Sequence, residues 1–316
     1  MRAVMVLSEN WTIIRPDDLG AVVDLAVAAE SAGVDTVMLS EHIVLGPSAG
    51  ARGRMTNARD YAAPGNQDPA TPWPDSVVLA AAIGVRTTRL RVALAAVITP
   101  LRHPLQLAKQ LGTLDVLLQG RLVVQPTVSW AEEEYAALGV PFHERGAILD
   151  EQLDAMRAAW TQSPARHDGP RFPFGPVWCE PRPARPPAMW FGGEQLSDTH
   201  LRRLVHHGHG FHPFGRPTPE ERDRLDAAWH DAGRAEPLEL VGGIRGTFYG
   251  ADDVADLDLA LAAVPQLRRE GWTAVCFKPN HFTDDIDDVP SVCERVVAAM
   301  NISATRTPVR HTKGTT

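Results

Sequence analysis

A polar triplet that follows a short apolar run is the part of the sequence best suited to chemistry. Residues 36–39 are mostly apolar and come after Gly33 and a helical pattern, which predicts a buried strand of a parallel sheet. Ser40, Glu41 and His42 follow at its carboxyl end. Ligands of parallel α/β folds meet the carboxyl ends of strands, and an acid beside a histidine is suited to proton transfer. The alternative is a structural role, in which Glu41 and His42 bond to nearby backbone.

The elements that must position this triplet alternate between strands and helices. Eight strand-like and at least eight helical segments predict an α/β protein, a closed (β/α)8 TIM barrel of parallel strands. A doubly wound open sheet is the alternative, but no Gly-x-Gly-x-x-Gly follows the first strand to support dinucleotide binding. The expected strands are 3–7, 36–39, 91–98, 122–125, 188–191, 210–212, 238–241 and 273–277. The expected helices are 17–31, 75–86, 104–118, a short one from 132, 144–160, 197–207, 219–232, 254–269 and 289–300.

Residues 43–74 interrupt this alternation directly after the polar triplet. They hold no period, and a loop of this length in a compact domain is functional or disordered. Because it leaves a strand at the expected active-site end, we expect a lid or a wall of a substrate pocket. Its Arg52, Arg54 and Arg59 are suited to an anionic group, or are simply solvated. Residues 301–316 are polar and aperiodic, so we expect one domain over 1–300 followed by a flexible tail.

Composition excludes several classes of protein. The 316-residue chain is 44% hydrophobic and carries a net charge of −8, which argues against nucleic-acid binding. It has neither an apolar run of transmembrane length nor a signal peptide, so we expect a cytoplasmic protein without a membrane partner. Three distant cysteines form no disulfide or zinc pattern, and no Gly-x-Ser-x-Gly elbow is present. Four histidines have spacings that suit metal ligands, but no Cys or carboxylate completes a set, so no metal is expected. They are His206, His207, His209 and His212.

Several stretches resemble the bacterial luciferase-like superfamily in their order and spacing, and most closely its subgroup thought to use the deazaflavin F420. The resemblance spans roughly residues 1–300. It is carried by Ala29–His42, Thr71–Asp75, Pro100–Gln110, Thr113–Leu117, Gly120–Leu122, Ala137–Phe142, Trp190–Gly193 and Gly208–Phe214.

The resemblance implies a flavin-type cofactor, F420 or FMN, at the carboxyl face of a (β/α)8 barrel. F420 members pass a hydride to or from a small organic substrate, whereas reduced FMN reacts with oxygen in monooxygenases. Family members often form homodimers. His42 matches the family's strand-two histidine, which would exchange a proton or stabilise charge on the reduced ring, and Glu41 would orient it or contact the cofactor.

The resemblance also implies the cofactor-binding residues. The ring would lie over a bulge in the strand 91–98, and the phosphate would lie at a glycine pair and the start of the following helix. Small residues suit a flat ring, and backbone N–H groups at a helix start attract phosphate. The residues expected to contact the cofactor are Ala96, Val97, Thr99, Ser129, Trp130, Gly192, Gly193 and Ser197.

The expected fourth strand departs from the family pattern. Gln125, Thr127 and Ser129 stand where the family usually has glycines, and their side chains would crowd a cofactor that needs close backbone. Two hypotheses therefore remain. The chain is a flavin-class oxidoreductase, or it is a repurposed barrel that has lost flavin redox chemistry and binds a ligand or works without a cofactor.

Overall fold

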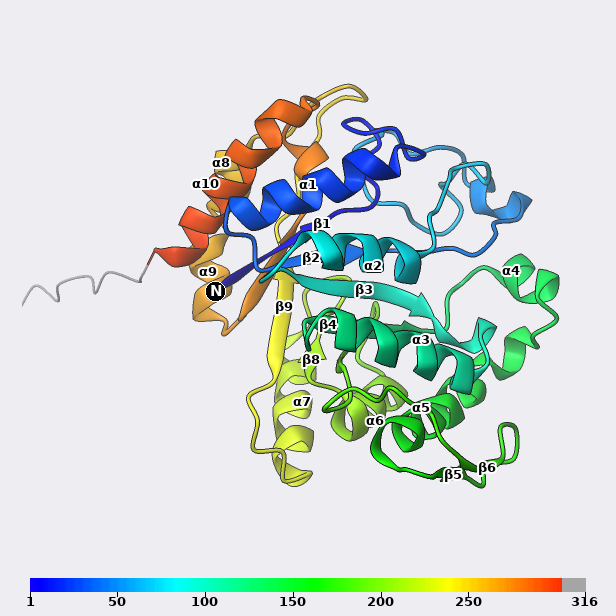
Figure 1. Cartoon of the computed structure of the whole chain (residues 1–316). Helices are drawn as coiled ribbons and strands as arrows, with labels where there is room; N and C mark the ends of the chain where they lie inside the picture. The colour runs from blue at the N-terminus through cyan, green and yellow to red at the C-terminus, as the bar shows by residue number, and fades with distance from the viewer. Residues whose placement is uncertain (303–316) are drawn as a thin grey trace, which may run out of the picture.

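Eight parallel strands close into a barrel in the computed structural model, which describes residues 1–302 (Figure 1). The (β/α)8 prediction is confirmed, whereas residues 303–316 of the expected tail lie outside the described residues. Around the barrel the strands follow in the order β1 (Arg2–Val6), β10 (Ala274–Phe277), β9 (Glu239–Gly243), β8 (Gly210–Phe211), β7 (Ala188–Phe191), β4 (Leu122–Thr127), β3 (Arg91–Ile98) and β2 (Thr36–Leu39).

Helices surround this barrel, and many begin where the sequence provides a cap. Asp75, for example, is an N-cap residue whose side chain accepts a hydrogen bond from Val78 N. The helices are α1 (Leu19–Ser31), α2 (Ser76–Arg86), α3 (Pro104–Leu117), α4 (Glu132–Ala137), α5 (Arg145–Thr161), α6 (Asp198–His207), α7 (Pro219–Asp231), α8 (Leu257–Leu261), α9 (Val264–Arg269) and α10 (Val289–Asn301).

Two segments differ from the expected elements. The helix expected over 254–269 is two helices, α8 and α9, because Pro265 lacks the N–H that a continuous helix needs and instead stands in the first turn of α9. The irregular stretch 163–187 contains an antiparallel pair that we did not predict, β5 (Ala165–His167) and β6 (Phe174–Val177). Both strands are short and β6 contains Pro176, so they carry no clear alternation.

The barrel lumen is filled by side chains, and its amino-terminal end is closed. Trp190 is fully buried among the inward-facing residues of β1, β2, β3, β4, β9 and β10. Its indole Nε1 donates to Glu239 Oε2 at 2.9 Å, and Arg91 donates to both oxygens of the same carboxylate at 2.9 and 3.2 Å. Arg91 and Glu239 are the first residues of β3 and β9, so this ion pair forms the floor of the barrel.

The segment 43–74 folds over the opposite, carboxyl end of the barrel, with one 3-10 turn (η1, Pro47–Gly50) inside it. Asn57 Nδ2 donates to the carbonyl oxygens of Gly250 and Asp253, both at 2.9 Å. Buried Arg59 forms an ion pair with Asp284. The insertion is therefore attached to the loops that follow β9 and β10.

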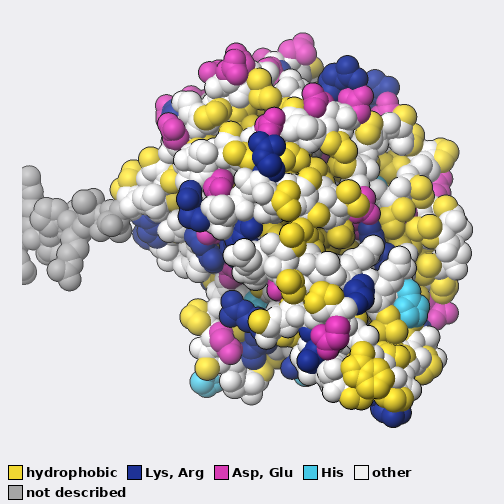
Figure 2. Space-filling model, in the orientation of Figure 1, with side chains coloured by type: hydrophobic (Ala, Val, Ile, Leu, Met, Phe, Trp, Pro, Cys, Tyr) yellow, Lys and Arg dark blue, Asp and Glu magenta, His cyan; other side chains and the backbone are white. Residues whose placement is uncertain are grey.

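The charged side chains on one face of the molecule and the lengths of the helices bear on the kinds of partner the protein could have. Acidic and basic side chains are interspersed on the face shown in Figure 2. In residues 1–302, no helix has the length and apolarity needed to span a membrane.

Candidate active site

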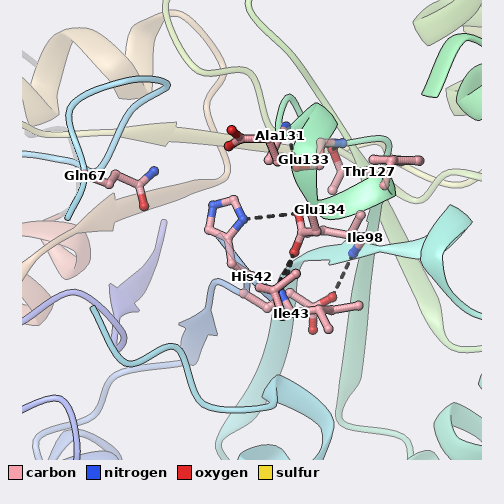
Figure 3. Close-up of polar contacts among 12 residues, drawn as sticks. His42, Ile43, Gln67, Ile98, Thr127, Ala131, Glu133 and Glu134 are labelled. Atoms are coloured by element: carbon pink, nitrogen blue, oxygen red, sulfur yellow. Dashed lines mark hydrogen bonds and ion pairs between the residues drawn. The ribbon is translucent and has the colours of Figure 1, made fainter. Parts of the chain in front are cut away.

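His42 lies at the carboxyl end of the barrel with a buried carboxylate as its partner (Figure 3). Its Nδ1 is 3.4 Å from Oε2 of Glu134, which is fully buried in α4. The other oxygen, Oε1, accepts hydrogen bonds from Ile43 N at 2.5 Å and Val44 N at 3.2 Å. We assign the imidazole proton to Nδ1, because a carboxylate oxygen accepts hydrogen bonds. Nε2 is then free to accept a proton.

Glu134 is a residue that sequence reasoning missed. Its side chain is fully buried, although Glu132 in the same helix is exposed. Three consecutive glutamates give no local signal that one of them points inward. The contact with His42 joins parts of the chain that lie far apart in sequence, and this cannot be read from either part alone.

Two tryptophans enclose the imidazole. The His42 ring meets Trp73 edge to face at a centroid distance of 5.3 Å and Trp130 at 5.5 Å. The side chain of His42 is only 9% exposed as a result. Trp130, expected from the resemblance, therefore lies in the site, whereas Trp73 of the insertion was not predicted.

Glu41 does not orient His42. Its oxygens accept hydrogen bonds from Ser76 Oγ at 2.6 Å and Ile98 N at 2.8 Å, and from Arg102 at 2.7 and 3.1 Å. Within residues 1–302, no hydrogen bond joins Glu41 to His42. The hydrogen bonds of Glu41 instead connect the end of β2 to the carboxyl end of β3 and to the start of α2.

β3 contains the expected bulge. The register between β3 and β4 shifts between Ala95 and Val97, and the peptide bond between Ala95 and Ala96 is cis. Ala96 is half-buried, while Val97 and Thr99 are buried. Of the three bulge residues that we expected at the cofactor, Ala96 is thus the accessible one.

The three residues that replace glycines in and after β4 behave differently from one another. Gln125 is buried, and its Oε1 lies 2.8 Å from Nδ1 of His212. Thr127 ends the strand half-buried, and Ser129 adopts φ 58°, a left-handed conformation that glycine favours. Ser129 therefore keeps the backbone that a glycine would give, whereas Gln125 fills part of the lumen.

His212 links Gln125 to a cysteine across the barrel. Its Nε2 is 3.6 Å from Sγ of Cys276. Burial lowers the pKa of His212 to about 4 and raises the pKa of Cys276 to about 12, so both are neutral. The thiol then donates to Nε2, and Nδ1–H donates to Gln125. The remaining histidines of the possible metal set lie elsewhere; His209 Nδ1, for example, accepts from Met189 N at 3.1 Å.

The start of α6 has carboxylates where a phosphate was expected. Ser197 caps the helix by accepting from His200 N at 3.3 Å, and the preceding N–H, of Leu196, donates to Glu221 at 2.8 Å. Asp198 adds a second negative charge in the first turn. These contacts do not favour a phosphate at this helix.

The glycine pair before α6 is explained by packing. A Cβ atom at Gly192 would lie 1.7 Å from the carbonyl oxygen of His212, and one at Gly193 would lie 2.9 Å from the ring of His200. Glycine at these positions lets β7 run close to the segment after β8. Neither close approach involves space left for a ligand.

A further polar group lies at the ends of β1 and β10, and the sequence analysis did not predict it. Glu9 is buried with φ 71°, and its Oε2 accepts from Ala62 N at 3.0 Å. Lys278 is fully buried and lies 3.7 Å from the same oxygen. His42 was identified because it is a polar residue that follows a strand. Glu9 and Lys278 follow neighbouring strands in the same way, so the sequence analysis could have identified them too.

Comparison with known proteins places these observations in a family context. The family profile described as luciferase-like monooxygenase matches residues 1–277. An uncharacterized protein of Mycobacterium tuberculosis is 35% identical over 233 residues, which cover 72% of this chain and 76% of that protein. The crystal structure of the monooxygenase RslO1 from Streptomyces bottropensis superposes with a TM-score of 0.70 at 19% identity, covering 95% of this chain and 98% of that one.

Relatives with established cofactors use F420 or reduced FMN. An F420-dependent glucose-6-phosphate dehydrogenase of Kribbella flavida is 28% identical over 54% of this chain and 46% of its own length. An FMNH2-dependent dimethylsulfone monooxygenase of Pseudomonas putida is 30% identical over 36% of this chain and 32% of its own length.

Proposed function

The chain belongs to the luciferase-like monooxygenase family, and we propose that it is a flavin-class oxidoreductase whose reaction takes place beside His42. The cofactor would be F420, with hydride transfer to or from a small organic substrate, or reduced FMN, with oxygenation of that substrate. The observation that carries this proposal is the His42–Glu134 pair at the end of β2, next to the strand whose bulge exposes Ala96.

The residues around His42 fit the polar edge of a flavin-type ring. Trp73 Nε1 and Gln67 Oε1 are buried and have no hydrogen-bond partner within residues 1–302. Figure 3 shows the Gln67 amide directed toward the imidazole. An unpartnered donor and an unpartnered acceptor cost free energy, and the C=O and N–H groups of such a ring can satisfy both. Ala96 offers the small surface on which a flat ring can lie.

Each of these residues has a task in the proposed reaction. When bound, the cofactor supplies the hydride or the reduced ring that reacts with oxygen. His42 exchanges a proton at Nε2, and Glu134 holds the imidazole in the tautomer that leaves Nε2 free. Trp73 and Trp130 limit the access of water to the imidazole.

A cofactor titration tests the proposal. Purified protein is titrated with F420, with FMN and with buffer, and binding is followed by visible absorbance and by quenching of cofactor fluorescence. We expect saturable binding of one of the two cofactors. The absence of binding to either, by protein whose circular dichroism shows it to be folded, would remove the redox assignment. The expected homodimer stays a prediction that light scattering can test.

A second candidate function, a barrel without flavin redox chemistry, is favoured by specific contacts. Glu221 and Asp198 occupy the helix start that would hold a phosphate, and the Gln125–His212 pair fills part of the lumen. In this case the pocket would bind a ligand or catalyse a reaction without a cofactor. The same titration separates the two candidates.

A further inference from the structure

An aromatic side chain of the insertion lies between two cations at the carboxyl end of the barrel. The ring centroid of Tyr61 is 4.9 Å from Arg245 Cζ and 5.1 Å from Lys278 Nζ. The ring of His281 meets it edge to face at 5.1 Å. Tyr61 also packs against the inward-facing cluster of the barrel, which includes Cys276. We call the space bounded by Arg245, Lys278 and His281 the ring slot.

Burial raises the pKa of the Tyr61 phenol, and the acidic Glu9 and Asp60 raise it further. Both acidic residues also lie near Lys278, so Arg245 is the cation of the ring slot that is left to attract an added negative charge. Lys278 is partly balanced by Glu9 at 3.7 Å, but its hydrogen bond goes to an uncharged group, the backbone oxygen of Asp60, at 2.7 Å. Arg245 is exposed and has no ion pair in the part of the chain that the structure describes. A neutral ring interacts with these cations only through its π face, whereas a ring with a carboxylate or phenolate adds a full opposite charge.

The position of the ring slot sets it opposite the expected cofactor surface. Arg245 and Lys278 follow β9 and β10, and β9 is four places from β3 in the closed order of eight strands. A ligand in the slot therefore faces the Ala96 bulge across the barrel. This is where a substrate must lie in order to react with a ring resting on β3.

We propose that the ring slot is the substrate pocket, that its substrate is a flat aromatic anion such as an arene carboxylate or a phenolate, and that Tyr61 fills the slot when no substrate is bound. The reaction in this pocket rests on the proposed function, but the binding does not.

The contacts of Tyr61 allow such an exchange. The neighbouring residues of the insertion are held by hydrogen bonds from Lys278 to Asp60 O and from Ala62 N to Glu9. An incoming anion can replace the carbonyl oxygen of Asp60 as the acceptor for the Lys278 ammonium. The ion pair formed is stronger than the hydrogen bond given up. Tyr61 and its neighbours then move out as the ligand moves in.

Calorimetric titration of protein without cofactor tests the proposal, with benzoate as the probe and benzamide as its neutral analogue. Tyr61→Ala removes the occupant, so it should bind benzoate about tenfold more tightly than the unaltered protein. Tyr249→Ala, which truncates an 86% exposed tyrosine, is the matched control and should not change the affinity. Adding Arg245→Gln to Tyr61→Ala should remove most of the preference for benzoate over benzamide.

Two results would overturn the proposal. One is equal affinity of Tyr61→Ala for benzoate and benzamide, which would describe a plain cavity. The other is benzoate binding that Arg245→Gln leaves unchanged in the unaltered background, a measurement that does not depend on whether Tyr61→Ala folds. Cofactor titration is independent of both results. Cofactor binding without benzoate binding would remove the ring slot alone, and the reverse would leave a ligand-binding barrel.

Discussion

The surroundings of His42 and the start of α6 were both expected to contact one cofactor, yet they are built in opposite ways. Around His42, Trp73 Nε1 and Gln67 Oε1 are buried and have no hydrogen-bond partner among the described residues. At α6 the corresponding donor is already used, because Leu196 N–H donates to Glu221. The first region is prepared for a polar ring, and the second is satisfied by the protein's own carboxylates. Recognition should therefore depend on the ring much more than on a phosphate.

The largest expected effect is on turnover when the imidazole is removed. His42→Ala should lower turnover by about 10²–10³-fold, because it deletes the proton-exchanging group, while the Kd of the cofactor changes little. His143→Ala, which truncates an exposed histidine, should leave both unchanged. Steady-state rates and cofactor titrations measure the two quantities. If His42→Ala turns over at the same rate as the unaltered protein, His42 has no role in proton exchange.

A smaller effect is expected at Glu134. Glu134→Gln keeps the shape of the side chain but lets an amide N–H replace the acceptor that orients the imidazole, so turnover should fall by about tenfold. Glu134→Asp restores a carboxylate and should recover part of that loss, which a purely structural role would not produce. Glu132→Gln, in the same helix but exposed, is the control. Equal turnover of Glu134→Gln and Glu132→Gln would contradict the positioning role.

Acid should destabilise the protein through buried histidines near the barrel mouth. Burial lowers the pKa of His212 to about 4 and that of His281 to about 3. The unfolded chain binds protons below its ordinary pKa near 6.5, so stability present at neutral pH is lost as pH falls from there toward these values. His212 alone can account for up to about 2 kcal/mol between pH 6.5 and pH 5. Urea unfolding at several pH values measures this, and His212→Asn should show a shallower slope.

The smallest effect is the difference between two ligands that share a ring. FMN and riboflavin differ by the phosphate, and their Kd values should agree within about threefold because the start of α6 offers carboxylates. A phosphate bound by several charge-assisted hydrogen bonds would instead give a preference for FMN of about tenfold or more. Glu221→Gln should move the ratio toward FMN. A strong preference for FMN in the unaltered protein would contradict the conclusion that the start of α6 contributes little to cofactor binding.

The fold was predictable from local patterns. The strand 91–98 was predicted correctly because an apolar run is a signal that is contained within a few positions. The barrel followed from counting such elements.

The site was less predictable, since its contacts join distant segments. Whether Glu41 or Glu134 faces His42 depends on the direction of each side chain at the barrel end. The placement of Tyr61 between Arg245 and Lys278 depends on how a loop without regular structure folds back. Residue types mark such groups as candidates, but their partners come only from the packed chain.

Trp190 and the Arg91–Glu239 pair close the amino-terminal end of the barrel, so a ligand can enter its interior only from the carboxyl end. Of two ligands bound there, the one that binds second must dissociate first, because neither can leave through the closed end. If an aromatic anion occupies the place of Tyr61 and a flavin-type ring lies beyond it on β3, the ring has to be loaded earlier and released later. Binding and release would then follow a compulsory order. In steady-state kinetics, an unreactive analogue of the aromatic anion would be an uncompetitive rather than a competitive inhibitor with respect to the cofactor.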